Sequence, residues 1–135
     1  MSARSILIDE WCVAAIVDAT HPLHNPAVVA YAAQFPEYER GEVRLFARSD
    51  ILERYPTQVR RGALAPIETA WVTRQHRATA ARTTVPDPSV ALTLAVFSRE
   101  RFWALMTLNP AYAEYDINVL LIEATPSSEV AAADA

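Results

Sequence analysis

The chain has 135 residues, of which 52% are hydrophobic and 21% charged, and its net charge is −4. This length and composition indicate one globular domain with a real core and exclude a disordered or fibrous protein. No apolar run approaches the ~20 residues that span a bilayer, and the apolar stretch near the start is too short for a signal peptide. We therefore expect a cytoplasmic protein without a membrane segment.

Cysteine and charge narrow the function classes further. Cys12 is the only cysteine, so an internal disulfide and a cysteine-based zinc site are excluded, and its apolar surroundings predict a core residue. Residues 40–82 carry nine arginines and four acids, a net charge of +5, whereas the rest of the chain carries −9. Such a positive segment can attract a phosphate backbone, although a solvated helical face explains the same pattern without any ligand.

Short strands and helical segments alternate along the chain. Apolar patterns predict strands at residues 6–8, 42–46, 104–108 and 117–122. Helical periodicity predicts helices at residues 11–19, 27–35, 49–56 and 87–101. Residues 58–84 are helix-prone but interrupted, and a loose tail at residues 124–135 follows a single domain at 1–123. This order predicts an α/β fold with a central, mainly parallel sheet of four to five strands flanked by helices.

Acidic and amide side chains stand where the predicted strands end. Asp9 ends the first strand, Glu53 follows the second, Asp87 begins the long helix, and Asn109 follows the strand at residues 104–108. Ligands of parallel sheets bind at the carboxyl ends of the strands, so we expect these side chains to converge. Clustered carboxylates repel one another unless a cation neutralises them, and Mg²⁺ or Mn²⁺ prefers such oxygen ligands. A metal held there can polarise a phosphodiester and help to generate the attacking hydroxide.

Each of these residues also has a purely structural explanation. Asp87 and Asn109, each followed by proline, can cap a helix or turn, and Asp9 can cap the helix that follows it. Asp50 and Glu53 have the spacing of a capping box. Taken singly, each residue fits a structural role better than a catalytic one. Only their joint placement at one edge of the sheet favours a functional site.

In this order the motifs resemble the PIN-domain family, which includes the VapC-type toxin ribonucleases. The opening Ile6-Leu7-Ile8-Asp9 resembles the family's first strand, which ends in its first catalytic Asp. The segments at 45–53 (LFARSDILE) and 87–95 (DPSVALTLA) are similar to those that carry the family's second and third acids. The segment at 107–110 (TLNP) resembles its terminal strand and acidic turn. The resemblance covers most of residues 5–123.

This resemblance implies a metal-dependent endoribonuclease that hydrolyses RNA phosphodiesters. It assigns Asp9, Glu53, Asp87 and Asn109 to the catalytic site, with Asp9 and Asp87 holding Mg²⁺ or Mn²⁺. The spacing from Glu53 to Asp87 is short for the family, so Glu68 is the alternative second acid. Asn109 stands where an Asp is common in the family, and the missing negative charge predicts a weaker metal affinity.

The resemblance also implies partners. It predicts an RNA substrate whose phosphates contact arginines such as Arg54, Arg60 and Arg61, an antitoxin-like protein partner and a homodimer. Because Asn109 leaves the acidic site incomplete, the alternative function is a catalytically inactive PIN-like interaction or regulatory module.

Other enzyme classes lack their motifs in this chain. A phosphorelay receiver needs a lysine, and the chain has none; its two glycines form no phosphate-binding loop. Three histidines give a zinc hydrolase few ligands, and the prolines around His21 and His24 suit a loop better than a ligand helix. No serine has the strand–turn–helix setting of a hydrolase nucleophile.

Overall fold

Five parallel strands form the centre of the molecule. The computed structural model describes residues 3–123, and within them the strands are β1 (Arg4–Ile8), β2 (Val43–Arg48), β3 (Ile67–Ala70), β4 (Ala104–Thr107) and β5 (Val119–Leu121). They lie in the order β3-β2-β1-β4-β5, and every neighbouring pair is parallel. The predicted fold class, a parallel α/β sheet of four to five strands, is confirmed. The loose tail predicted at residues 124–135 lies outside the described residues.

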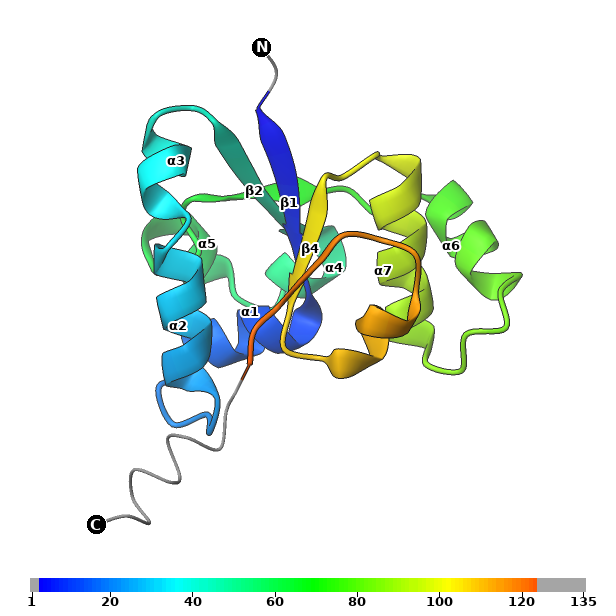
Figure 1. Ribbon diagram of the computed structural model, residues 1–135, viewed down its shortest axis with the longest axis horizontal. Coiled ribbons are helices and arrows are strands. Elements are labelled where there is room, and N and C mark those ends of the chain that lie inside the picture. Colours follow the sequence, from blue (N-terminus) through cyan, green and yellow to red (C-terminus); the bar gives the residue numbers. More distant parts are fainter. Residues whose placement is uncertain (1–2, 124–135) are drawn as a thin grey trace.

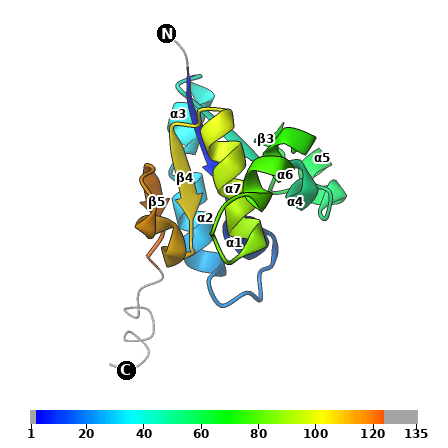
Figure 2. The ribbon, with the colours of Figure 1, turned by 90° about the vertical axis from the view of Figure 1, so that its right-hand side faces the viewer.

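Helices cover both faces of this sheet (Figure 1). They are α1 (Glu10–Val17), α2 (His24–Ala32), α3 (Phe35–Glu39), α4 (Ser49–Leu52), α5 (Pro56–Arg61), α6 (Arg74–Ala81), α7 (Pro88–Arg99) and the 3₁₀ helix η1 (Pro110–Glu114). In Figure 1, α2 and α3 lie to one side of the strands and α6 and α7 to the other, and Figure 2 looks onto the α6 and α7 side. None of the described helices is long and apolar enough to cross a membrane.

The two faces of the sheet belong to two hydrophobic cores. Ile6 and Ile8 of β1 pack in the core that includes α1 and α2, whereas Leu7 between them packs in the core under α7. All three side chains are fully buried, which explains why β1 is a continuous apolar run and not an alternating one. Cys12 lies fully buried in the first of these cores, as the sequence predicts.

The structure differs from the prediction in residues 58–84. This segment is expected to be helix-prone but interrupted, and the interruption is a strand, β3, which lies between the helices α5 and α6. β3 has four residues and lies at an edge of the sheet, with only Ile67 and Ala70 buried. A short edge strand buries too few side chains to produce a clear strand pattern, so the helix propensity of its neighbours dominates the sequence signal. The helix expected at residues 27–35 is likewise divided between α2 and α3.

The parallel arrangement brings the carboxyl ends of all the described strands to one edge of the sheet. Ile8, the last residue of β1, pairs with Met106 of β4, so Asp9 and Thr107 lie next to each other at that edge. On the other side of β1, Leu7 pairs with Phe46 of β2, so the end of β2 reaches the same level. This edge is where a ligand site of a parallel sheet is expected.

Candidate acidic site at the carboxyl edge of the sheet

Three carboxyl groups and one amide border a small pocket at the carboxyl ends of β1 and β4. They belong to Asp9 and Glu10 at the junction of β1 and α1, to Asp87 before α7, and to Asn109 after β4. The pocket has a volume of about 20 Å³, which is room for one water molecule or a small cation. Of the four residues predicted for the site, the structure thus brings together Asp9, Asp87 and Asn109, and it places Glu53 elsewhere.

Asp9 is the most buried of these carboxyl groups, with an exposed fraction of 2%. Its Oδ1 accepts a hydrogen bond from the backbone N–H of Cys12 at 3.0 Å, so the side chain caps α1. Its Oδ2 accepts a hydrogen bond from the hydroxyl of Thr107 at 2.7 Å. Burial raises the pKa of Asp9 to about 6, although both hydrogen bonds act in the opposite direction. Asp9 therefore holds a proton over a pH range in which an ordinary aspartate is ionised.

The pKa of Glu10, the next residue, is shifted in the opposite direction to that of Asp9. Its Oε1 accepts a hydrogen bond from the hydroxyl of Ser89, and its Oε2 pairs with the guanidinium of Arg54, each at 2.6 Å. Burial works against ionisation of Glu10, but Ser89 and Arg54 outweigh it, so the pKa of Glu10 lies below its ordinary value. Two neighbouring carboxyl groups whose pKa values are shifted in opposite directions can take different roles in acid–base chemistry.

Asp87 and Asn109 act as helix caps at the rim of the pocket. Oδ1 of Asp87 accepts a hydrogen bond from the backbone N–H of Ser89 at 2.8 Å and so caps α7. Oδ1 of Asn109 accepts a hydrogen bond from the backbone N–H of Ala111 at 3.0 Å and caps η1. The structural explanation considered for these residues is therefore correct, and it is compatible with a role in the pocket that both of them border.

Glu53 and Glu68, the two candidates for the second acid, both lie outside the pocket. Glu53 is exposed at the carboxyl end of α4 and borders a separate hollow beside Trp71. Glu68 lies on β3 and forms an ion pair with Arg44. The pocket takes its third carboxyl group from Glu10 instead.

Glu10 and Ser89 are the residues that the sequence argument missed. Glu10 directly follows Asp9, and a side chain in the first turn of a helix that starts at a strand end returns to the same edge of the sheet. Ser89 stands two residues after Asp87, in the first turn of α7. The position of each residue in the first turn of a helix could be predicted from the sequence. The hydrogen bond between Glu10 and Ser89 could not, because the two residues are 79 positions apart.

Arg48, the last residue of β2, ties the sheet to the first turns of α7. It is buried, with an exposed fraction of 3%, and donates hydrogen bonds to both carboxyl oxygens of Asp50. It also donates to the carbonyl oxygen of Ser89 at 2.9 Å and to the hydroxyl of Thr93 at 2.8 Å. Burial works against ionisation of Asp50, but Arg48 outweighs it, so the pKa of Asp50 lies below its ordinary value. The capping box considered for Asp50 and Glu53 does not form, because α4 begins at Ser49 with Arg48 at the N-cap position, so Asp50 lies inside the helix.

The oxygen donors of the pocket are of the kind that Mg²⁺ or Mn²⁺ binds. In the present arrangement both oxygens of Asp9 and both oxygens of Glu10 accept hydrogen bonds, whereas Oδ2 of Asp87 has no partner in residues 3–123. The same residues include no group of three or more His, Cys, Asp or Glu side chains arranged to hold a metal ion. The oxygen donors are therefore chemically suited to a hard cation. To bind it, Asp9 or Glu10 would have to give up one of its present hydrogen bonds.

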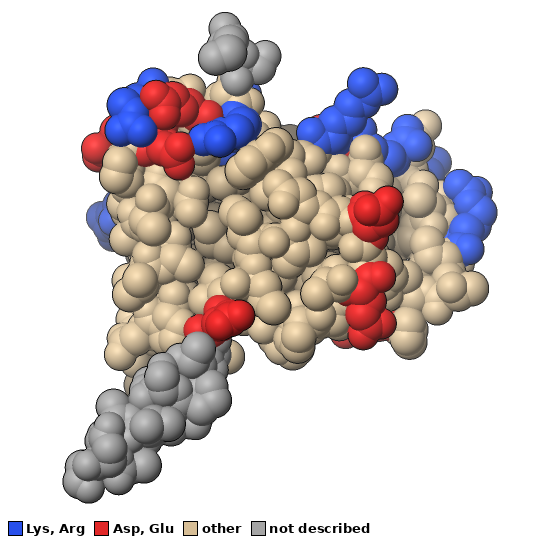
Figure 3. All heavy atoms as spheres, viewed as in Figure 1, with Lys and Arg blue, Asp and Glu red and all other residues tan. Residues whose placement is uncertain are grey.

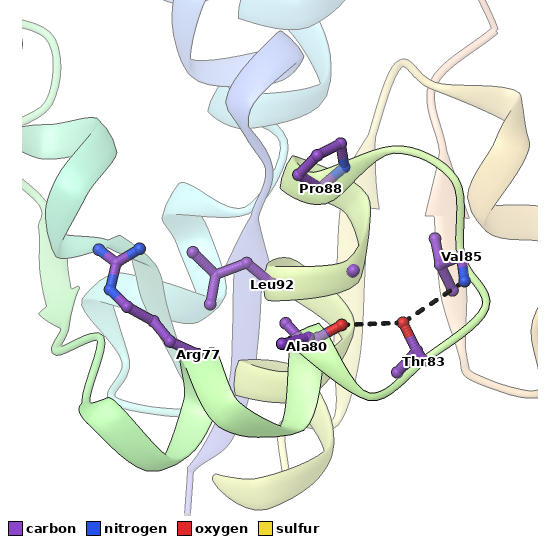
Figure 4. Close-up of a pocket in the computed structure, with 8 residues that line it drawn as sticks. Arg77, Ala80, Thr83, Val85, Pro88 and Leu92 are labelled. Carbon is purple, nitrogen blue, oxygen red and sulfur yellow. Dashed lines mark hydrogen bonds between the residues drawn. The ribbon is translucent and has the colours of Figure 1, made fainter.

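A larger cavity of about 350 Å³ lies between α6 and α7 (Figure 4). It is lined by Arg77 and Ala80 of α6 and by Pro88 and Leu92 of α7, and Thr83 of the connecting loop donates a hydrogen bond to the carbonyl oxygen of Ala80. Arg77 is the only charged residue of this lining. The cavity therefore offers no acid–base pair, unlike the smaller acidic pocket.

The five strands are all parallel, in the order β3-β2-β1-β4-β5, and the acidic pocket lies at the carboxyl ends of β1 and β4. Among solved structures, the sarcin–ricin-loop-cleaving toxin VapC20 of Mycobacterium tuberculosis is similar, with a TM-score of 0.61 over 83% of this chain and 95% of that chain. The two sequences are 14% identical, so this likeness shows the fold alone. No family model matches the sequence, and no curated protein matches it. The resemblance to PIN domains is thus confirmed at the level of the fold.

Proposed function

We propose that this chain is a metal-dependent endoribonuclease of the PIN type that acts on single-stranded RNA in the cytoplasm. The observation that carries the proposal is the convergence of Asp9, Glu10 and Asp87 on one pocket at the carboxyl edge of a PIN-like sheet. The structurally similar VapC20 is a toxin that cleaves the sarcin–ricin loop. By analogy, an antitoxin-like partner and a homodimer belong to the same proposal.

Each residue of the pocket has a distinct role in this proposal. Asp9 and Asp87 hold Mg²⁺ or Mn²⁺, and Glu10 supplies a third carboxylate beside them. When bound, the cation polarises the phosphodiester and makes a water molecule more acidic. Thr107 orients Asp9 and Ser89 orients Glu10 through the hydrogen bonds described above.

The Asp87→Asn variant is expected to lose RNA cleavage while keeping its fold. Asparagine caps a helix about as well as aspartate, so α7 is retained, but the charge that would hold a cation is removed. We expect the rate to fall by roughly 100-fold or more, because a bound cation stabilises the transition state by several kcal/mol. The measurement is cleavage of a labelled single-stranded RNA with Mg²⁺ or Mn²⁺, together with a circular dichroism spectrum.

A matched control for this variant is Glu68→Gln. It also neutralises one carboxylate, but Glu68 lies outside the pocket and pairs with Arg44, so cleavage should remain at the wild-type rate. Full metal-dependent cleavage by Asp87→Asn would refute the assignment of the acidic pocket.

A second candidate function is a catalytically inactive PIN-like interaction or regulatory module. It is favoured by the hydrogen bonds that already occupy Asp9 and Glu10, and by Asn109 at the fourth position of the site. In this case the polar groups stabilise the sheet edge, and Asp9, Asp87 and Asn109 serve as helix caps alone.

Thermal unfolding with and without millimolar Mn²⁺ distinguishes the two functions. A ligand that binds only the folded state stabilises it by ~2.7 kcal/mol at one hundred times its dissociation constant. We expect Mn²⁺ to raise the unfolding midpoint of the wild type and not that of Asp87→Asn. If neither protein responds to the metal, the inactive module becomes the better assignment.

A further inference from the structure

Trp71 lies exposed at the same edge of the sheet as the acidic pocket. It directly follows β3, and its exposed fraction of 71% is the largest of any bulky hydrophobic side chain in residues 3–123. By the strand registers, Asp9 lies opposite Arg48 of β2, and Arg48 pairs with Ala70 of β3. Trp71 therefore lies one residue further along its strand direction than Asp9. β3 and β1 are two strand spacings apart, roughly 10 Å.

The backbone around Trp71 is held firmly although its side chain is exposed. The N–H of Val72 donates a hydrogen bond to the hydroxyl of Ser49 at 3.0 Å, which ties this segment to α4. The N–H of Thr73 donates to Nδ1 of His76 at 2.9 Å, within the capping box that starts α6. The backbone that carries the indole is therefore fixed, and a flat ligand that stacks on the ring orders only the two torsions of the Trp71 side chain.

Trp71 borders a hollow of about 300 Å³ whose lining is mostly apolar. Leu52 of α4 and Val59 of α5 contribute apolar surface, whereas Glu53 and Arg60 add one charge of each sign. An aromatic face, apolar walls and a few polar groups are the combination that binds a nucleobase, since every base has a flat π-face and hydrogen-bonding edges.

The charges around Trp71 favour a nucleic acid over a protein as the occupant. Arg60 and Arg61 end α5, and Arg74 and Arg77 begin α6, so cationic side chains flank Trp71 on both sides along the chain. None of the four forms an ion pair with another residue of the described part of the chain. In Figure 3, basic side chains gather on the side of the molecule where α6 lies. Unpaired arginines next to an exposed aromatic ring match the backbone and bases of a single strand.

We propose that Trp71 and the hollow beside it bind one nucleobase of a single-stranded RNA, next to the nucleotide that enters the acidic pocket. The base stacks on the indole of Trp71, and Arg60 contacts a phosphate of the same strand. Glu53 accepts a hydrogen bond from an exocyclic amino group, so the site prefers cytosine to uracil. This inference rests on the proposed function and gives Glu53 a recognition role in place of the catalytic one expected from the sequence.

The test is RNA binding in EDTA, so that cleavage does not interfere. The probe is a fluorescein-labelled oligo(C) of about 10 nucleotides, followed by fluorescence anisotropy. Trp71→Ala should weaken binding by about 5- to 150-fold, the effect of losing one base–aromatic stack. Trp71→Phe should retain most of the affinity. Trp103→Ala is the matched control, because Trp103 is also exposed but lies before β4, at the opposite edge of the sheet, over Arg4.

The role of Glu53 is tested by comparing oligo(C) with oligo(U). The wild type should bind oligo(C) about tenfold more tightly, because the Glu53 carboxylate accepts a hydrogen bond from the 4-amino group of cytosine, whereas uracil carries the acceptor O4 at that position. Glu53→Gln should bind both oligonucleotides alike, since an amide both donates and accepts.

The outcomes separate this inference from the proposed function. Wild-type binding by Trp71→Ala, or no RNA binding by the wild type, overturns the inference, and the cleavage assay then decides the function by itself. A change in self-association without a change in RNA binding would show a protein interface and also overturn it. Trp71-dependent binding without cleavage under any metal condition would support the inference and reject the nuclease.

Discussion

The Asp9→Asn variant is expected to be more stable than the wild type at pH 7, by about 3 kcal/mol. Burial raises the pKa of Asp9 from 3.8 to about 6, so the folded state binds this proton more tightly than the unfolded chain does. Ionising the buried group therefore destabilises the fold progressively between about pH 4 and pH 6, and the full cost of about 3 kcal/mol is present above pH 6. Asparagine removes this cost because it is never charged.

The replacement should fit the site without strain. Asparagine is as good an N-cap as aspartate, so the hydrogen bond from Cys12 is retained. The hydroxyl oxygen of Thr107 already accepts a hydrogen bond from the backbone N–H of Asn109, and its second lone pair can accept one from the new amide. Urea unfolding in EDTA at pH 4.5 and pH 7 measures the effect, and the gain should be about 1 kcal/mol at the lower pH. Equal stability of the two proteins at pH 7 would contradict the argument.

A stabilised Asp9→Asn variant would also bear on function. A buried acid that weakens the fold at neutral pH, at a position where asparagine caps equally well, is better explained by a chemical role than by a structural one. If the same variant is also unable to cleave RNA, stability and activity oppose each other at this residue, as is common in active sites.

Arg48→Met is expected to destabilise the protein by about 3 kcal/mol. Removing one partner of a buried ion pair costs ~3–5 kcal/mol, and the lower end applies because the Asp50 side chain is 26% exposed. In the variant, the carbonyl oxygen of Ser89 and the hydroxyl of Thr93 also lose the hydrogen bonds that the guanidinium donates to them. Because these contacts fix the start of α7, RNA cleavage should fall as well, through displacement of Asp87 and Ser89.

Arg44→Met is the matched control for this variant. Arg44 is on the same strand and also pairs with a carboxylate, Glu68, but both side chains are largely exposed, at 54% and 41%. Exposed pairs of this kind contribute ~0–1 kcal/mol, so the free energy of unfolding should change little. A loss in Arg48→Met no larger than that of the control would show that Arg48 does not hold α7 in place.

Much of the fold follows from local patterns in the sequence. Local patterns predict the strands β1 and β4 and the long helix α7, because each of these elements buries a set of apolar side chains. β3 escaped prediction because it is a four-residue edge strand with two buried side chains, and its pairing with β2 is a contact between distant parts of the chain.

The sequence by itself determined which strand ends carry polar side chains, and among them are Asp9, Asp87 and Asn109, which border one pocket in the structure. Only the tertiary structure decided the third carboxyl group, Glu10 in place of Glu53. It also decided the opposite pKa shifts of Asp9 and Glu10. The physical reason is that ionisation depends on burial and on hydrogen-bond partners. The partner of Asp9, Thr107, is 98 positions away in the sequence, and the partner of Glu10, Ser89, is 79 positions away. Local sequence patterns carry no information on contacts over such separations.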